Sequence, residues 1–267
     1  MRYGCAGGAG FAHERALAFS LNSRVRRSAL RSLAALWLLV LGCAACGSKP
    51  AAPPEPGASP VPTTGDARKL ALSDALVRGC DRADALGGSL GPEVGAMAVD
   101  FVLKDTQGNQ HSLSGLLADK PVVMILGSFT CPVFRGTCTA TEALYSQYGG
   151  KVHFIVVYTI EAHPIGSKCP YSDQESPSSY SVDLQGSPVH QPLSYEERLL
   201  LARKTAAEAG ISVPVLVDEM DNPVWCTYGA APNAAYLIGT DGTVLAQQRW
   251  YEPRLIESAI LTYTSSS

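Results

Sequence analysis

The stretch PVVMILGSFTCPVFRGTC, residues 121–138, decides the fold of this chain. Its first part, PVVMIL, is wholly apolar, which is typical of a strand buried on both faces of a sheet. Cys131 then stands directly before Pro132, a residue that suits the first turn of a helix because it has no N–H to lose. The sequence therefore predicts a buried strand, a corner that carries a cysteine, and a helix over 134–148.

Strand and helix signals continue on both sides of this stretch. Ser194, with Glu197 three residues later, predicts the start of a helix that runs to Ala209 and stops at Gly210. The other predicted elements are hairpins at 98–113 and 234–250, buried strands at 152–158 and 213–218, and short or terminal helices at 70–86, 223–228 and 252–263. This order resembles the α/β layout of thioredoxin-like domains, with a mixed central sheet, helices on both faces and a preceding N-terminal helix.

The N-terminal part predicts export and anchoring. Residues 33–46, LAALWLLVLGCAAC, form an uncharged run of 14 residues after several arginines, shorter than the roughly 20 residues that span a bilayer. Its VLGC end resembles a bacterial lipobox, which makes Cys43 the expected lipidated residue, with Cys46 as the alternative and an ordinary membrane anchor as the other interpretation. The predicted parts are a signal peptide at 1–42, a lipid anchor and proline-rich tether at 43–65, a helical extension at 66–98 and the thioredoxin-like domain at 99–267.

These features predict a place in the bacterial cell envelope. The protein would be lipid-anchored and face the periplasm, on the outer membrane where the host has one, because Ala44 rather than aspartate follows Cys43. The net charge of −3 gives no reason to expect a nucleic-acid partner. The cysteines and histidines lack the paired spacing of zinc ligands, so we expect no metal.

Cys131 is the candidate nucleophile. A thiol at a helix N-terminus has its pKa lowered by unpaired N–H groups, and the hydroxyls of Ser128 and Thr130 could donate hydrogen bonds to the sulfur. The alternative is a buried structural cysteine. Cys131 does not begin a C-x-x-C pair, because Phe134 occupies the place of the second cysteine. Cys138 lies about 10 Å along the helix, beyond the roughly 7 Å between Cα atoms that a disulfide allows unless the helix unwinds.

Three separated segments carry a family resemblance: GSFTCP at 127–132, YTIEAHP at 158–164 and VDEMDNPVWCTYGAAPNAAYLI at 217–238. They resemble segments of the iodothyronine deiodinases, thioredoxin-fold enzymes that remove iodine from thyroid hormones. The resemblance implies that Cys131 stands where animal members carry selenocysteine, His163 on the catalytic histidine and Glu161 on the second of two glutamates. A weaker match, HQPLSYEERL at 190–199, aligns His190 with a second histidine, implying a role in substrate binding.

The chain also departs from the family pattern. Ile160 replaces the first glutamate, Phe129 replaces a small residue, and AQQRWYEP at 246–253 stands in place of a glycine-rich loop. That loop lies near where the hormone would bind, so the resemblance supports the chemistry better than the substrate. Among the remaining polar residues, we expect structural roles for His111 and His153, a simple turn at 220–222, and solvated side chains for Arg198 and Arg249.

The sequence thus predicts a thiol oxidoreductase of deiodinase-like type. The Cys131 thiolate would attack a halogen or another soft electrophile on a small aromatic substrate, His163 would supply a proton, and Glu161 would hold or tune that histidine. Cys169, in the polar loop at 163–192, is the predicted resolving thiol. We expect turnover to need an external thiol reductant and no cofactor. A homodimer stays open.

Two other functions fit the same residues. In a peroxidase of peroxiredoxin type, the Cys131 thiolate would attack peroxide, and Ser128 would orient it. A copper-delivery protein of the same fold is the non-enzymatic alternative, although such proteins place their cysteines closer together.

Overall fold

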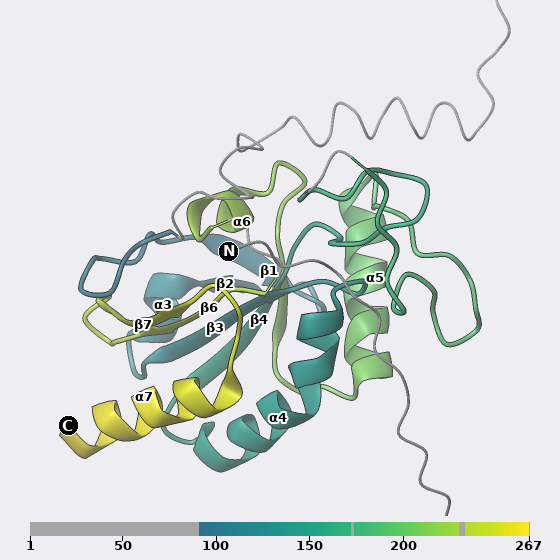
Figure 1. Ribbon diagram of the computed structural model, residues 1–267. Coiled ribbons are helices and arrows are strands. Elements are labelled where there is room, and N and C mark those ends of the chain that lie inside the picture. The colour runs from purple at the N-terminus through teal and green to yellow at the C-terminus, as the bar shows by residue number, and fades with distance from the viewer. Residues whose placement is uncertain (1–90, 172–173, 230–232, 267) are drawn as a thin grey trace, which may run out of the picture. The chain divides into compact units, whose positions relative to one another are not determined.

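The computed structural model describes residues 91–171, 174–229 and 233–266 (Figure 1). The predicted signal peptide, Cys43, the tether and the helix over 70–86 lie outside the described residues. Seven strands form one sheet in the order β2-β1-β5-β4-β3-β6-β7. The strands are β1 (Val102–Asp105), β2 (Gln110–Ser112), β3 (Val122–Gly127), β4 (His153–Tyr158), β5 (Val215–Val217), β6 (Ala235–Ile238) and β7 (Val244–Gln248).

The three central strands are parallel and buried. β3 pairs with β4, placing Gly127 opposite Tyr158, and β4 pairs with β5, placing Tyr158 opposite Val217. Every residue of β3 and β5 is buried, as expected of strands covered on both faces. Because parallel strands share one direction, the segments that follow Gly127, Tyr158 and Val217 leave the sheet at the same edge.

Antiparallel hairpins complete the sheet on both sides. β1 pairs with β2 and with β5, while β6 pairs with β3 and β7. The sheet is therefore mixed, as predicted. Residues 95–98 run beside the start of β7, where the Gly95 N–H donates to the Val244 carbonyl and the Val244 N–H to the Ala96 carbonyl, each at 2.9 Å.

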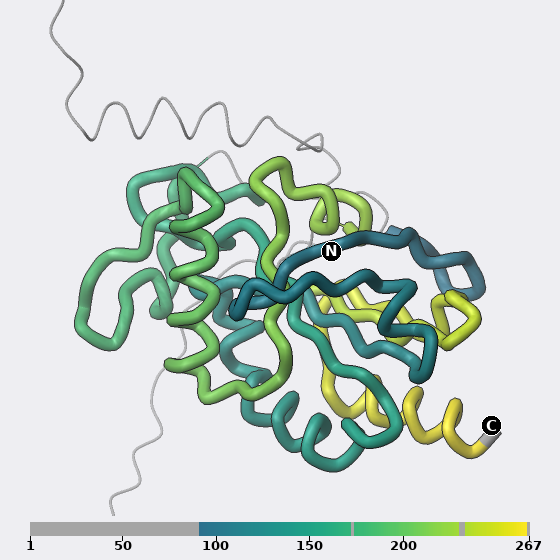
Figure 2. The backbone as a smooth tube through the Cα atoms, turned by 180° about the vertical axis from the view of Figure 1, so that it is seen from behind, coloured from purple at the N-terminus to yellow at the C-terminus, as the bar shows by residue number. Residues whose placement is uncertain are grey.

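Helices cover both faces, which confirms the predicted thioredoxin-like arrangement (Figures 1 and 2). They are α3 (Leu113–Leu117), α4 (Pro132–Tyr148), α5 (Tyr195–Ala209), α6 (Pro223–Thr227) and α7 (Pro253–Ser266). Helices α4, α5 and α7 pack into one apolar core with Val123, Ile125 and Val156, while α3 and α6 pack into another with Val122, Met124 and Leu126. Adjacent residues of β3 thus point into opposite cores, as the pleat of a strand requires.

Two helix starts differ from each other in their caps. α4 begins at Pro132, with Cys131 as its N-cap. α5 begins after Ser194, whose hydroxyl accepts from the Glu197 N–H at 3.2 Å, and it ends at Gly210, where φ is 64°. The Ser194 N-cap and the Gly210 C-cap of α5 are therefore confirmed, while the Glu197 carboxylate accepts from the Leu193 N–H at 2.9 Å. The sequence missed the short helix α3, which starts after Ser112.

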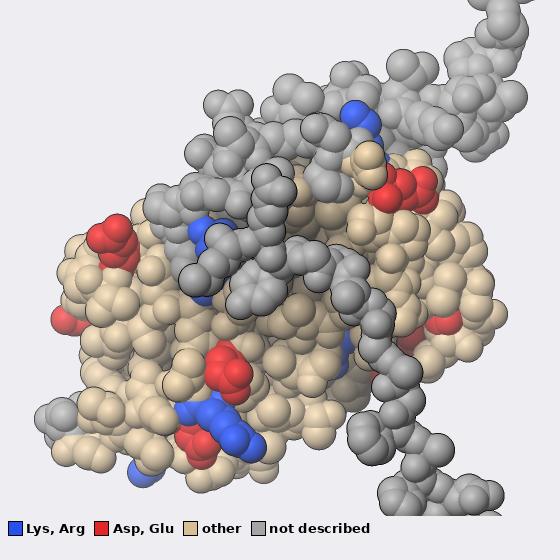
Figure 3. Space-filling model, viewed as in Figure 1, with Lys and Arg blue, Asp and Glu red and all other residues tan. Residues whose placement is uncertain are grey.

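The described surface carries both signs of charge. On the face drawn in Figure 3, basic and acidic side chains are interspersed among uncharged ones. Within the described ranges, we find no helix that combines the length and the apolar character needed to cross a membrane.

Candidate active site

Cys131 lies at the corner between β3 and α4, with its sulfur over the start of the helix. The Phe134 N–H points at Cys131 Sγ, 3.4 Å away, and the residue is 1% exposed. Gly127, the last residue of β3, makes this packing possible, because a Cβ at that position would lie 2.3 Å from the Phe134 ring. The chain therefore brings the thiol to a helix N-terminus, as predicted.

The predicted low pKa of Cys131 is wrong for this conformation. Burial raises the pKa of the thiol to about 11, and the nearby charge of Glu161 also raises it. The N–H groups of Phe134 and Val133 lower the pKa, but by less. The helix N-terminus does favour an anion, but removing the sulfur from water outweighs that effect. At neutral pH the group is a thiol here, and it needs water or a ligand to become a thiolate.

Glu161 is the centre of a buried hydrogen-bond network beneath this corner. Its carboxylate accepts from the Thr130 N–H at 2.8 Å, from the Thr130 hydroxyl at 2.7 Å and from the Tyr158 hydroxyl. The residue is fully buried, and burial raises the pKa of the carboxyl although the hydrogen bonds from Tyr158 and Thr130 oppose that rise. The network fixes the backbone directly before Cys131.

His163 joins the network through Thr130. The His163 backbone N–H donates to Thr130 Oγ1 at 2.9 Å, while ring Nδ1 lies 2.7 Å from the Ser176 carbonyl. A carbonyl can only accept, so Nδ1 carries the proton, and Nε2 is the nitrogen that can exchange one. The sequence predicted that Glu161 holds the histidine, and the structure makes that link indirect, because Thr130 bonds both.

The hydroxyls of Ser128 and Thr130 were predicted to donate hydrogen bonds to the sulfur of Cys131, but they bond other groups. Ser128 Oγ accepts from the Ala162 N–H at 3.2 Å, and Thr130 Oγ1 donates to Glu161. Both therefore tie the 161–163 segment to the loop before α4, rather than bonding the sulfur. Ser128, Thr130, Cys131, Glu161 and His163 nevertheless meet at one sheet edge.

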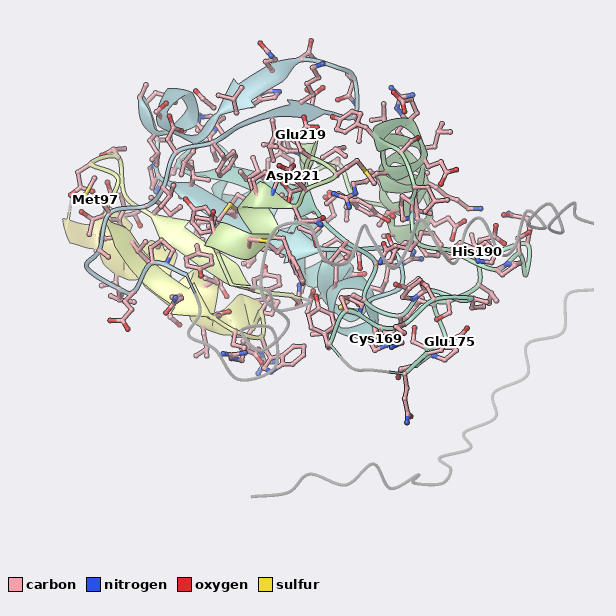
Figure 4. All side chains as sticks on the ribbon, turned by 90° about the horizontal axis from the view of Figure 1, so that it is seen from above. Met97, Cys169, Glu175, His190, Glu219 and Asp221 are labelled. Atoms are coloured by element: carbon pink, nitrogen blue, oxygen red, sulfur yellow. The ribbon has the colours of Figure 1, made fainter. Side chains whose placement is uncertain are left out.

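Two serines of the loop at 163–192 donate hydrogen bonds to the backbone of the segments that carry the site. The Ser178 hydroxyl donates to the Thr130 carbonyl at 2.9 Å, and the Ser181 hydroxyl donates to the His163 carbonyl at 2.6 Å. Figure 4 labels Cys169, Glu175 and His190 along this loop. The loop therefore holds the segments on both sides of the site.

Cys169 lies in the same loop and is 3% exposed. Its sulfur accepts from the Tyr171 N–H at 3.4 Å. Burial raises the pKa of Tyr171 well above its usual value, with smaller contributions from the thiols of Cys131 and Cys169. The Tyr171 hydroxyl accepts from Trp225 Nε1 at 3.2 Å, and that hydrogen bond lowers the pKa of Tyr171.

His190 bonds within the loop at 163–192 rather than to the sulfur of Cys131. Its Nδ1 lies 2.8 Å from the Ile165 carbonyl. It lines a surface groove of about 270 Å³ between the loop and α5, with residues that include Val189, Leu200 and Lys204. The described lining of that groove does not include Cys131 or His163.

Arg198 corrects the expectation of a solvated side chain. It is 2% exposed, and its guanidinium donates to the carbonyls of Asp218 at 3.1 Å and Glu219 at 2.5 Å and to Asn222 Oδ1 at 2.9 Å. The predicted turn at 220–222 is therefore pinned to α5, beside α6 (Figure 4). Arg198 shares a buried helix face with Ala202 and Thr205, and that spacing was the available signal.

Asp218 completes this second cluster. Its carboxylate accepts from the N–H groups of Val224 at 3.2 Å and Trp225 at 3.0 Å, at the start of α6. Burial raises its pKa to about 6, although the Trp225 N–H and the charge of Arg198 lower it. The cluster holds α6 against the end of β5.

The other cysteines and histidines are also placed. Cys131, Cys138 and Cys169 are free thiols, whereas Cys226 is part of a disulfide. His111 and His153 each lie 2.8 Å from an aspartate, Asp105 and Asp119, as expected of structural histidines. Over the part of the chain that the structure describes, no three His, Cys, Asp or Glu side chains are grouped so that they could hold a metal ion.

The fold resembles that of several solved thiol proteins. A putative protein disulfide isomerase from Bacteroides thetaiotaomicron is 20% identical with a TM-score of 0.45, covering 66% of this chain and 92% of that one. Peroxidoxin BcpB from Mycobacterium tuberculosis is 17% identical with a TM-score of 0.45, covering 65% and 97%.

Curated relatives are closer in sequence. Thyroxine 5-deiodinase of Ovis aries is 31% identical over 148 residues, which are 55% of this chain and 46% of that protein. The Homo sapiens enzyme is 30% identical, over 55% and 44%. The chain thus spans less than half the length of these relatives. A sequence profile of the iodothyronine deiodinase family matches residues 86–249, well over half of the chain, so the chain belongs to the iodothyronine deiodinase family.

Proposed function

We propose that this protein is a thiol-dependent reductive dehalogenase of deiodinase-like type, with Cys131 as its nucleophile. The observation that carries the proposal is the position of Cys131: a free thiol at the N-cap of α4, directly after a residue held by Glu161. Family membership and the match of Glu161 and His163 to the family segments support the same reaction. The substrate class is a small aromatic molecule that carries a halogen.

The reaction consists of one displacement and one proton transfer. The Cys131 thiolate forms a bond to the halogen as the carbon–halogen bond breaks, and the carbon takes a proton from His163. The products are the dehalogenated ring and a Cys131 sulfenyl halide. A thiol then attacks that sulfur, forming a disulfide and releasing halide and a proton. An external thiol reductant restores Cys131, and the sequence predicts Cys169 as the intervening thiol.

His163 suits the proton transfer because its ring is already oriented. The Ser176 carbonyl holds Nδ1, which leaves Nε2 directed elsewhere as the exchangeable nitrogen. Thr130 and Glu161 act on its backbone and are positioning residues. Since burial raises the pKa of Cys131, water or the substrate must reach the sulfur before the thiolate forms.

The direct test compares two substrates on one protein. Purified protein with excess dithiothreitol is supplied with an iodinated phenol or with hydrogen peroxide, and iodide release and peroxide loss are measured. We expect iodide release that disappears in Cys131→Ser. Peroxide turnover without iodide release would instead favour the peroxidase, in which the Ser128 hydroxyl, now accepting from Ala162, still has a proton to donate to peroxide.

We also propose a lipid-anchored envelope protein with Cys43 modified. The basis is the VLGC end of the apolar run and the proline-rich tether after it. Cys43→Ala should release the protein from the membrane fraction, while Cys46→Ala should not. Membrane association that persists in Cys43→Ala would contradict this anchor.

A further inference from the structure

We infer that Cys138 is the resolving thiol, which forms a transient disulfide with Cys131 when the first turns of α4 open. This inference rests on Cys131 being the nucleophile proposed above. It assigns the step that follows the attack to a residue of the same helix rather than to the loop at 163–192.

The backbone of Phe134 joins the two thiols. Its N–H donates to Cys131 Sγ at 3.4 Å, and its carbonyl accepts from Cys138 Sγ at 3.3 Å. Seven residues correspond to almost two complete helical turns, so both cysteines lie on one face of α4. Both are buried in the same apolar core, with 1% and 3% exposure. Opening the turn at Phe134 therefore frees both sulfurs at once.

A buried cation stands between the two cysteines in the sequence. The Arg135 side chain is 7% exposed, and its guanidinium lies over the rings of Phe129 at 4.5 Å and Tyr180 at 5.0 Å. Its Nη1 is buried without a hydrogen-bond partner, and the Glu208 carboxylate is 3.8 Å from Nη2, beyond hydrogen-bond distance. The guanidinium therefore has an unused donor that an anion could fill.

That cation acts on Cys138. Burial raises the pKa of the Cys138 thiol to about 11; the charge of Arg135 lowers it, while the charges of Glu142 and Cys131 raise it by smaller amounts. A resolving thiol attacks as a thiolate, so a cation that offsets burial favours the attack. Once the turn opens and water enters, the burial effect weakens while the charge of Arg135 remains nearby.

The segment between the cysteines is a weak helix. Val133, Gly136 and Thr137 all have low helix propensity, and the Thr137 hydroxyl bonds back to the Phe134 carbonyl at 2.9 Å. Gly136 is exposed, and a Cβ there would meet nothing within 4 Å, so no packing requires the glycine. Once these residues leave the helix, the chain between the cysteines can turn back, so the separation of roughly 10 Å can close to the 7 Å or less that a disulfide needs.

The chemistry balances with peroxide as the probe oxidant. The Cys131 thiolate attacks one peroxide oxygen, forming sulfenic acid and releasing hydroxide. The Cys138 thiolate then attacks the Cys131 sulfur. A sulfur–sulfur bond forms, the sulfur–oxygen bond breaks, and the hydroxide takes a proton to leave as water. With a halogenated substrate, halide leaves in the same step.

The test oxidises the full-length protein with one molar equivalent of hydrogen peroxide and maps the products by peptide mass, with and without dimedone. We expect a Cys131–Cys138 bridge in the wild type and in Cys169→Ser. In Cys138→Ser we expect a Cys131 sulfenic acid that dimedone traps. A Cys131–Cys169 bridge, or a stable wild-type sulfenic acid, would overturn the inference and leave the proposed nucleophile standing. A Cys131 that stays unoxidised in every variant, together with iodide release that survives in Cys131→Ser, would overturn both.

A matched pair of glycine variants tests the opening itself. Gly136→Ala should slow bridge formation about fivefold, the equivalent of roughly 1 kcal/mol of helix propensity. Gly150→Ala makes the same change at an exposed, uncrowded position beyond the end of α4, and it should leave the rate unchanged. Equal rates in all three proteins would contradict an opening of α4.

Discussion

The starts of α4 and α5 meet the same physical requirement with different groups. Each helix leaves N–H groups without intrahelical partners at its first turn. At α5 a hydroxyl and acidic residues meet them: Ser194 caps the Glu197 N–H, and Glu196 and Glu197 fill the first turn. At α4 the acceptor is the sulfur of Cys131, and no acidic residue stands in the first turn. The cap of α5 stabilises its helix, whereas at α4 the partial positive charge of the helix N-terminus acts on the sulfur of Cys131 alone.

The two starts also differ in how their anion is handled. The side chains of Glu196 and Glu197 are exposed to solvent, and acidic residues in the first turn stabilise a helix through its dipole. The Cys131 thiol is buried, and at neutral pH it stays uncharged. A helix end that attracts an anion without holding one is suited to forming that anion only when a substrate arrives.

The largest expected effect comes from giving α4 the type of cap that α5 has. Cys131→Ser should lower dehalogenation by roughly 10⁴-fold or more, because a neutral hydroxyl cannot replace the thiolate nucleophile. Serine is a preferred N-cap, so the melting temperature should not fall. Turnover and thermal unfolding of the variant measure both effects. Residual turnover near the wild-type rate would remove Cys131 from the mechanism.

The next effect concerns the proton that follows the attack. His163→Gln should lower turnover by roughly 10²- to 10⁴-fold, the usual contribution of general acid–base catalysis. The backbone N–H that donates to Thr130 is kept, so the fold should persist. His153→Gln is the matched control, and its turnover should match the wild type. Equal turnover in a folded His163→Gln would leave this segment with a structural role.

The pH dependence separates the two helix starts further. The folded pKa of Cys131, about 11, exceeds the unfolded value of about 8.5, so the fold favours the neutral thiol. Its stabilising contribution is complete below about pH 8.5 and is lost as the pH rises through 11. We expect iodoacetamide labelling of Cys131 to be slow at pH 7 and to rise about tenfold per pH unit up to that range.

A control for this titration is the Cys131→Ser variant, which should lose less stability between pH 8.5 and 11 than the wild type in denaturant unfolding. Rapid labelling at pH 7 that levels off near pH 8 would contradict a thiol held neutral by burial.

The smallest effect lies at the other helix start. Ser194→Ala removes the hydroxyl that caps α5 and should lower the free energy of unfolding by about 1 kcal/mol. Turnover should stay unchanged, since this cap is not part of the network around Cys131. Urea unfolding and an iodide assay check the two results, and a matching loss of turnover would show that the two helix starts are coupled.

Local patterns predicted most of the fold. The apolar runs at 121–126 and 152–158 are buried central strands, and the capping box at Ser194 starts a helix. These signals succeed because each depends on neighbouring residues alone. The short helix α3 was missed, because five residues carry too little periodicity to be separated from the adjoining hairpin.

The site was predictable in its members but not in its contacts. Sequence segments brought Cys131, Glu161 and His163 together, yet nothing in them indicates that Tyr158 bonds Glu161 or that Thr130 stands between Glu161 and His163. The raised pKa of Cys131 has the same origin, since burial in a core that several elements build together is a tertiary property. Arg198 was misjudged because arginine is exposed in most proteins.

Gly127 has a consequence for which sequences this site tolerates. A single methyl group there would collide with the Phe134 ring, and that ring belongs to the residue whose backbone holds Cys131 and Cys138. A mutation scan of the chain should therefore accept no replacement at this position without a smaller side chain at Phe134. Positions 127 and 134 should therefore covary: a side chain larger than hydrogen at position 127 requires a smaller side chain than phenylalanine at position 134.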